Sequence, residues 1–272
     1  MSKEITTGLK RNNNEQYYTK SYIAEDCIHN LANIYDLNDF ECVIEPSAGT
    51  GVFLKNLQKY NIKNVLSYDI DPKESTIKKQ DYLQTKIDKG NILVIGNPPF
   101  GRQSSLAKKF IKHSCLFARV IGFILPRSFK KESMTNVFSD FFHKVFEKDL
   151  ELNSFIYEEK EYGVPCVFQI WEKREYIRQK KEKLKENDTY IFVKKNENPN
   201  IAFRRVGGNA GKFFFDEFEK LSSESHYFIK KQNINEMFCK KIQEIKWNDN
   251  NTTGPKSISK QELIEEFNKI NN

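Results

Sequence analysis

The sequence has few of the features that mark secreted, membrane or zinc-stabilised proteins. Its five cysteines among 272 residues are scattered and form no Cys-x-x-Cys pair, which argues against structural zinc and a disulfide framework and favours a reducing, intracellular environment. No stretch approaches the about 18 apolar residues of a membrane-spanning helix. Residues Met1–Glu4 have no apolar run after their charge, so we expect no signal peptide. We also expect no metal site.

Charge and aromatic content say more than the missing features. Aromatic residues make up 13% of the chain, with 22 phenylalanines, so a substantial core is available. The net charge is +7, and from Lys173 onward there are 21 basic and 15 acidic residues, an excess of six. The basic excess therefore lies in the C-terminal third, where we expect either a polyanionic partner or a solvated Lys/Glu surface.

Short apolar runs alternate with helical patterns through the first 172 residues. We expect helices over Thr19–Tyr35, Val52–Tyr60 and Leu106–Ala118, and strands over Cys42–Ile44, Val65–Tyr68, Ile92–Ile95 and Val120–Leu125. Phe155–Tyr157 and Val164–Trp171 predict a β-hairpin across a charged turn. This alternation predicts an α/β fold, a doubly wound parallel sheet with an antiparallel edge hairpin.

The charged run Glu172–Asp188 is the best candidate for a domain boundary. Three short β-like runs follow it, at Tyr190–Val193, Ile201–Val206 and His226–Ile229. We therefore expect residues 1–172 to form the main domain and residues 173–272 a small, basic α+β appendage.

Asn97-Pro98-Pro99-Phe100 is the most informative segment, because it directly follows an expected buried strand. Two consecutive prolines fix two φ angles and offer no N–H group, so they hold the chain rigid. The Asn97 side-chain oxygen and the Pro98 carbonyl can each accept one hydrogen of an exocyclic amine, while Phe100 stacks on the ring that bears it. This tetrad therefore predicts a site for a planar group with an amine.

Three acidic positions come at consecutive strand ends. Glu45 opens the glycine loop Glu45–Gly51, in which Gly49 and Gly51 allow a ligand close to the backbone. A carboxylate there disfavours a phosphate and suits a cationic ligand. Asp69 ends the next strand, where it can accept from two ribose hydroxyls, and Asp81 can accept from an adenine amine. Each is by itself also typical of a surface acid, and their order carries the prediction.

With these elements in this order, the sequence resembles the S-adenosylmethionine-dependent methyltransferases that act on amino groups, in particular the gamma-ordered DNA adenine-N6 methyltransferases. The matching segments span residues 15–172 and are Glu15-Gln16-Tyr17-Tyr18-Thr19, Glu45–Gly51 with Phe53, Asp69-Ile70-Asp71-Pro72, Asp81-Tyr82-Leu83, Asn97–Phe100, Gly122–Pro126 and Val164–Trp171. The family more often has Tyr at position 100, and Phe100 keeps the stacking face.

The resemblance implies a seven-stranded, Rossmann-like class I methyltransferase fold with S-adenosyl-L-methionine as cofactor. It implies that the cofactor lies over the glycine loop, near residues Tyr18, Thr19, Glu45, Ala48, Gly49, Gly51, Asp69, Ile70, Asp81, Tyr82 and Asn97. Asn97, Pro98, Pro99 and Phe100 are then the catalytic residues.

The resemblance also implies a nucleic-acid partner, most simply double-stranded DNA whose target adenine flips out of the helix. Phe100 would stack on one face of the base and Phe168 on the other. Target recognition would fall to the C-terminal region, where Arg204, Arg205 and Lys212 flank a glycine-rich loop. We expect a cytoplasmic or nucleoid-associated protein, of the kind found in DNA modification and restriction–modification.

Three alternatives stay open. The same tetrad occurs in RNA adenine-N6 methyltransferases and in methyltransferases that act on a glutamine amide of translation release factors. The glutamine enzymes usually carry an extra N-terminal domain, and few residues precede Tyr18 here. A non-catalytic subunit that only binds nucleic acid is disfavoured, because the acidic positions and the tetrad are all present.

Overall fold

The computed structural model describes residues 17–180, 182–247 and 256–270. It divides into two compact units, with the division between Gln179 and Lys180, inside the charged run Glu172–Asp188. We call residues 17–179 the sheet unit and the described residues from 180 onward the C-terminal unit. None of the helices in the described ranges is long and apolar enough to cross a membrane.

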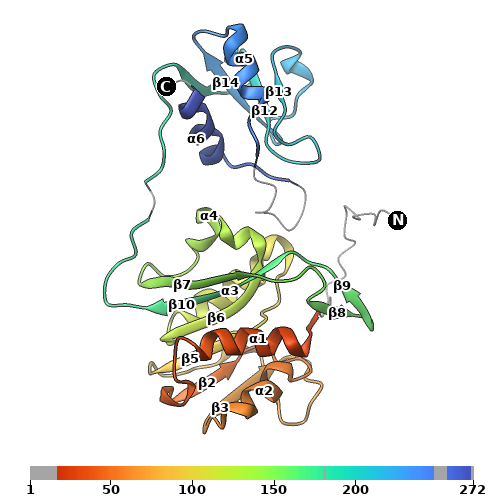
Figure 1. Cartoon of the computed structure of the whole chain (residues 1–272), viewed down its shortest axis with the longest axis vertical. Coiled ribbons are helices and arrows are strands. Elements are labelled where there is room, and N and C mark those ends of the chain that lie inside the picture. Colours follow the sequence, from red (N-terminus) through yellow and green to blue (C-terminus); the bar gives the residue numbers. More distant parts are fainter. Residues whose placement is uncertain (1–16, 181, 248–255, 271–272) are drawn as a thin grey trace. The chain divides into compact units, whose positions relative to one another are not determined.

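A seven-stranded sheet forms the centre of the sheet unit (Figure 1). In spatial order its strands are β4 (Lys78–Lys79), β3 (Val65–Asp69), β2 (Cys42–Glu45), β5 (Ile92–Gly96), β6 (Val120–Pro126), β10 (Cys166–Lys173) and β7 (Phe142–Asp149). The first five strands are parallel. β10 pairs antiparallel with both β6 and β7. The expected α/β fold, a mostly parallel seven-stranded class I methyltransferase sheet, is therefore confirmed.

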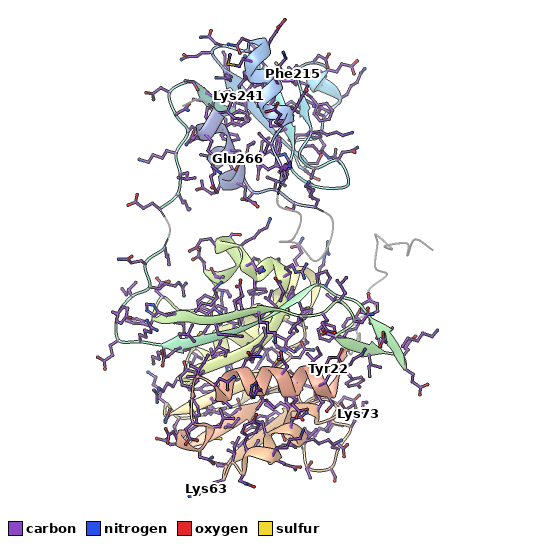
Figure 2. The ribbon with its side chains drawn as sticks, viewed as in Figure 1. Tyr22, Lys63, Lys73, Phe215, Lys241 and Glu266 are labelled. Atoms are coloured by element: carbon purple, nitrogen blue, oxygen red, sulfur yellow. The ribbon has the colours of Figure 1, made fainter. Side chains whose placement is uncertain are left out.

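Helices cover both faces of this sheet, which explains why its central strands are apolar throughout. β2, β5 and β6 are buried along their whole length, as expected for strands covered on both faces. α1 (Ser21–Ala32) and α2 (Val52–Leu57) pack with Val43 and Leu93 on one face. α3 (Ser105–Ser114) packs with Ile44 and Val94 on the other. Outward-facing residues such as Tyr22 on α1 lie on the surface of this layer (Figure 2).

The expected hairpin of Phe155–Tyr157 with Val164–Trp171 is wrong. β8 (Phe155–Tyr157) instead pairs with β9 (Lys160–Tyr162) and with β1 (Tyr18–Thr19) in a separate three-stranded sheet. β10 takes its partners from β6 and from β7, a strand that the sequence did not suggest. Charged residues interrupt the apolar positions of β7, because it is an edge strand with only one neighbour.

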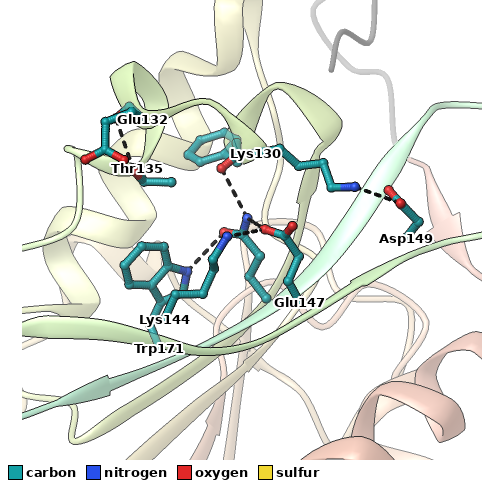
Figure 3. A network of polar contacts seen from close by, with 9 residues as sticks. Lys130, Glu132, Thr135, Lys144, Glu147, Asp149 and Trp171 are labelled. Carbon is teal, nitrogen blue, oxygen red and sulfur yellow. Dashed lines mark hydrogen bonds and ion pairs between the residues drawn. The ribbon is translucent and has the colours of Figure 1, made fainter. Parts of the chain in front are cut away.

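A buried polar network fastens β10 to its surroundings (Figure 3). The fully buried Gln169 donates to the Phe129 carbonyl at 3.1 Å and to Glu147 Oε2 at 2.8 Å. Its own oxygen accepts from Trp171 Nε1 at 3.0 Å. Every polar atom of this buried amide thus has a partner, which fixes the register of β10 between β6 and β7.

The C-terminal unit is a small α+β fold, as expected. Its antiparallel sheet has the order β11 (Tyr190–Val193), β14 (His226–Lys231), β12 (Ile201–Arg204) and β13 (Phe213–Phe214). α5 (Glu236–Gln243) and α6 (Lys260–Ile270) contribute Phe238 and Phe267 to its core. The expected strand Ile201–Val206 ends at Arg204.

Candidate active site

The loops that carry the candidate residues leave the same edge of the sheet. β2, β3, β5 and β6 are parallel, and β7 runs in the same direction because it and β6 both pair antiparallel with β10. Their carboxyl ends therefore meet at one edge, which is where open α/β sheets bind ligands. The glycine loop, Asn97 and Arg127 come at the ends of β2, β5 and β6, and Asp69 is the last residue of β3.

The glycine loop needs its glycines. Gly49 has a φ of 51° and Gly51 a φ of 72°, in the left-handed region that other residues rarely adopt. A Cβ atom at Gly49 would lie 3.1 Å from the Tyr18 ring. Asp69 Oδ2 accepts a hydrogen bond from the Gly49 amide at 2.7 Å, and the buried Ala48 donates to the Tyr68 carbonyl at 2.9 Å. The end of β3 thus holds the loop that follows β2.

Glu45 lies beneath this loop rather than on its surface. Its side chain is 1% exposed, and Oε2 accepts from the Leu54 amide at 3.0 Å, in the first turn of α2. Burial raises the pKa of Glu45 to about 8; the Leu54 amide opposes this rise and the nearby Asp69 adds to it. The carboxyl that the sequence suggested for a cationic ligand therefore serves first to hold the start of α2.

Tyr18 and Thr19 of β1 face the glycine loop and the Asn97 segment. Burial raises the pKa of the Tyr18 hydroxyl; Lys73 opposes this rise, whereas Asp69 and Asp71 add to it. Asp69 is the last residue of β3, and Asp71 and Lys73 lie on the loop that follows it (Lys73 is labelled in Figure 2). Tyr18 therefore lies next to the acidic end of β3, although the two segments are far apart in the sequence.

The side-chain amide of Asn97 has a fixed orientation. Its Nδ2 donates to Thr19 Oγ1 at 3.1 Å and to the Tyr17 carbonyl at 3.5 Å. Because a carbonyl can only accept, this pairing assigns the nitrogen and turns Oδ1 the other way. Oδ1 is buried, and no hydrogen-bond donor reaches it among the described residues. Buried polar atoms normally have partners, so this oxygen is an unsatisfied acceptor at the carboxyl edge of the sheet.

Hydrogen bonds to its backbone carbonyls fix the first and last residues of the tetrad. Ser47 Oγ donates to the Asn97 carbonyl at 2.9 Å, and the Leu106 amide at the start of α3 donates to the Phe100 carbonyl at 3.1 Å. Pro98 is buried and Pro99 exposed. Phe100 is half-buried and contacts the cores on both faces of the sheet. The tetrad Asn97–Phe100, which we call the clamp, is therefore anchored at both ends, and part of its aromatic ring is still accessible.

Three predicted cofactor residues differ widely in exposure. Ile70 is 70% exposed, directly after Asp69. Asp81 is exposed, and its Oδ1 accepts from the Leu83 amide at 2.9 Å. Tyr82 is fully buried, and its hydroxyl is 2.8 Å from Ser114 Oγ of α3. The Tyr82 side chain is therefore part of the core, and a cofactor contact through its backbone stays a prediction.

The expectation for Phe168 is corrected. Phe168 is 1% exposed on β10, and its ring packs where a Cβ atom at Gly122 would lie. It offers no free face to a base in this structure, because residues 166–171 of this strand are all buried and both of its faces are covered. The sequence did not indicate a half-buried aromatic group that lies beside Asn97. In this group the ring centroid of Tyr17 is 4.7 Å from that of Tyr162, on which it stacks, and 5.3 Å from that of Tyr157. Their clustering depends on β1 pairing with β8 and was not visible in the spacing.

The three basic candidates of the C-terminal unit have different roles. Arg204 Nε donates to the Val206 carbonyl at 2.9 Å, and Arg205 Nη2 donates to the Glu224 carbonyl at 2.5 Å. The Arg204 guanidinium therefore holds its own loop, whereas the Arg205 guanidinium ties the end of β12 to the segment before β14. Lys212 is exposed.

The residues at the carboxyl edge fit S-adenosyl-L-methionine, the cofactor expected from the sequence. Tyr18 packs directly against Gly49 of the glycine loop, the carboxylate of Asp69 lies beside that glycine, and Ile70 exposes an apolar side chain next to that carboxylate. These three features suit a ligand with a polar amino-acid end, a ribose and a flat apolar base.

Several solved structures are similar to this chain, each at low sequence identity. PH1948 from Pyrococcus horikoshii, a proposed RNA methyltransferase, is 19% identical over 62% of this chain and 93% of its own, with a TM-score of 0.47. The 23S rRNA methyltransferase ErmE is 13% identical over 60% and 71% of the two chains, with a TM-score of 0.45. Magnesium protoporphyrin IX methyltransferase (ChlM) from Synechocystis PCC 6803, with bound S-adenosylmethionine, is 13% identical over 56% and 79%, with a TM-score of 0.42.

The family assignment comes from the sequence. No curated protein matches the chain. The EDM2 methyltransferase-like domain family matches residues 35–185, more than half of the chain, and this range includes the glycine loop, Asp69 and the Asn97–Phe100 tetrad. This match does not name the gamma-ordered DNA adenine-N6 methyltransferases. The chain belongs to the family of EDM2 methyltransferase-like domains.

Proposed function

We propose that this protein is an S-adenosylmethionine-dependent methyltransferase that methylates the N6 amine of adenine in a nucleic acid, with DNA the polymer that the sequence pattern favours. The observation that carries the proposal is the buried, unpartnered Oδ1 of Asn97 at the carboxyl edge of the sheet. An acceptor fixed in this way suits an N–H donor, and an exocyclic amine supplies one hydrogen for it and a second for another acceptor.

The proposed chemistry rests mainly on positioning. When bound, the cofactor supplies an electrophilic methyl group on a sulfonium. Asn97 Oδ1 accepts one amine hydrogen and the Pro98 carbonyl accepts the other, so the nitrogen lone pair turns away from the ring toward that methyl. Formation of the N–C bond would release the methyl from the sulfonium, and the methylated amine would lose a proton to water. No strong base is needed, because the alkylated aromatic amine is acidic.

Phe100 supplies the remaining contact in this proposal. The Leu106 amide anchors its backbone carbonyl, and its half-buried ring offers the accessible part to the target base. Stacking of one base on an aromatic side chain contributes about 1–3 kcal/mol. A base in a duplex must leave the helix to reach the clamp, which costs a few kcal/mol.

The C-terminal unit is proposed to contact the polymer, with Lys212 its exposed cation among the three candidates. If Lys212 contacts one phosphate, replacing it with Gln should reduce by about 0.9 the slope of the logarithm of the binding constant against the logarithm of the salt concentration. An unchanged slope would remove this loop from the interface.

The test is transfer of a tritiated methyl group from the cofactor to duplex DNA, single-stranded DNA and RNA, followed by nucleoside analysis. N6-methyladenosine or its deoxy form is expected, and the polymer that accepts it identifies the substrate. Asn97→Ala should lower kcat by about 10²- to 10³-fold and leave cofactor affinity nearly unchanged. Asn64→Ala, at the exposed amino end of β3, is the control. Methylation of a glutamine-containing peptide without methylation of adenine would refute the proposal.

A further inference from the structure

Two unpartnered atoms lie at the ends of neighbouring strands. Among the described residues of the sheet unit, three buried side-chain polar atoms meet no hydrogen-bond partner: Asn97 Oδ1, Arg127 Nε and Arg178 Nη2. Arg178 is elsewhere, because its Nη1 donates to the carbonyl of Phe142, where β7 begins. Asn97 and Arg127 instead follow β5 and β6 at the carboxyl edge. One is an acceptor without a donor, and the other is a donor without an acceptor.

Arg127 is held rigidly in this position. Its amide donates to the Pro165 carbonyl at 3.0 Å, and the residue before it, Pro126, pairs with Cys166 of β10. The side chain is only 18% exposed. Asp149 Oδ1 lies 3.3 Å from Arg127 Nε, but the Nε hydrogen does not point at it well enough to make a hydrogen bond. The guanidinium is therefore fixed, mostly buried and incompletely satisfied.

The charges around Arg127 leave an excess of one positive charge. Lys130 Nζ lies 2.7 Å from Asp149 Oδ2 (Figure 3), so Lys130 and Arg127 share one carboxylate. Glu147, two residues earlier on β7, does not balance them, because Gln169 and Lys144 already bind it. Arg127 and Lys130 together therefore form a cationic group at the end of β6, with room for a further anion.

The register of β5 and β6 relates this cationic group to the clamp. Gly96 pairs with Phe123, so Asn97 lies about level with Ile124. Arg127 comes three residues further along, on the order of 10 Å in the strand direction. A single nucleotide spans this length between its base amine and its phosphate.

We infer that Arg127 and Lys130 bind a backbone phosphate of the nucleotide whose adenine amine contacts Asn97. This inference rests on the proposed function and deepens it. A nucleotide supplies both missing partners, since its amine donates to Asn97 Oδ1 and its phosphate accepts from Arg127 Nε. A glutamine amide in a protein supplies the first and has no anion for the second. The cationic group therefore favours a nucleotide substrate over an amide.

The test compares two oligonucleotides that carry the same target adenine. One has ordinary phosphates, and in the other neutral methylphosphonates replace both phosphates that flank the adenine. Arg127→Gln should raise the KM for the ordinary substrate about tenfold or more, with kcat largely kept, because a charge-assisted hydrogen bond to phosphate is lost. The same variant should leave the KM for the neutral substrate nearly unchanged. Arg127→Lys should recover part of the loss, because it keeps the charge without the planar group.

Lys144→Gln is the matched control. Like Arg127, Lys144 is paired with a carboxylate of β7, in this case Glu147. It lies outside the cationic group. Cofactor affinity and the melting temperature of each variant show that it is folded. Equal effects of Arg127→Gln on both substrates, or none on either, would overturn the phosphate site while leaving the methyltransferase proposal intact. Failure of the wild-type protein to methylate any adenine oligonucleotide would overturn the proposed function itself.

Discussion

Asn97 and Thr19 are 78 residues apart in the sequence, yet Asn97 Nδ2 donates to Thr19 Oγ1 at 3.1 Å. Thr19 belongs to β1, which pairs with β8 and not with the main sheet. The N-terminal strand of the described chain thus sets the direction of the amide that follows β5. The acceptor of the clamp therefore depends on a strand outside the main sheet.

Replacing Thr19 with Val removes this acceptor while nearly preserving the side-chain shape. The Asn97 amide then loses its stronger anchor, and kcat for methyl transfer should fall by up to about 10²-fold, because small displacements of a positioning group are costly. Thr19→Ser keeps the hydroxyl and should retain most of the activity. Steady-state kinetics and cofactor titration measure both. Equal kcat values for the Val variant and the wild type would show that Asn97 needs no such anchor.

Gly49→Ala tests the glycine loop. The φ of 51° places an alanine in the left-handed region, and its Cβ would lie 3.1 Å from the Tyr18 ring. We expect a loss of about 1–2 kcal/mol in the free energy of unfolding, together with weaker cofactor binding. Gly208→Ala is the control, because a Cβ there meets nothing within 4 Å. Urea denaturation and calorimetric titration measure the two effects, and equal stability of both variants would argue against a strained loop.

Glu45→Gln should change how stability depends on pH. The folded protein holds the Glu45 proton up to about pH 8, whereas the unfolded chain releases it near the ordinary value of 4.5. The folded state therefore binds more protons between these pH values, and this group makes stability fall as the pH rises through that window. Between pH 5 and 8 the melting temperature of the variant should change less with pH than that of the wild type. Glu25→Gln, on the surface of α1, is the control, and parallel curves for Glu45→Gln and wild type would contradict the prediction.

Gln169→Leu should destabilise the β6–β10–β7 part of the sheet. The change leaves the Phe129 carbonyl and Trp171 Nε1 buried without their partner (Figure 3). Each unsatisfied buried group costs about 1–3 kcal/mol. Denaturant melts should show this loss, whereas Gln84→Leu, at an exposed position, should have little effect. An equally stable Gln169→Leu protein would mean that packing alone sets the register of β10.

Local patterns in the sequence determined the main sheet and the residues at its carboxyl edge. Buried strands such as β2 and β5 are continuous apolar runs, and the glycines and prolines that follow them restrict the backbone wherever they occur. Their order was enough to predict the glycine loop, Asp69 and the clamp as neighbours. The edge strand β7 and the pairing of β8 with β9 were not predicted, because half-exposed strands carry a weaker pattern.

The tertiary structure decided which candidate side chains are free to act. It buried Tyr82 and Phe168 in the core, turned Glu45 toward α2, and bound Arg204 and Arg205 to the backbone carbonyl groups of Val206 and Glu224. It also left Asn97 Oδ1 and Arg127 Nε without partners. The sequence carries the identity and order of the hydrogen-bond donors and acceptors. Whether each of them finds a partner depends on contacts between segments that only folding brings together.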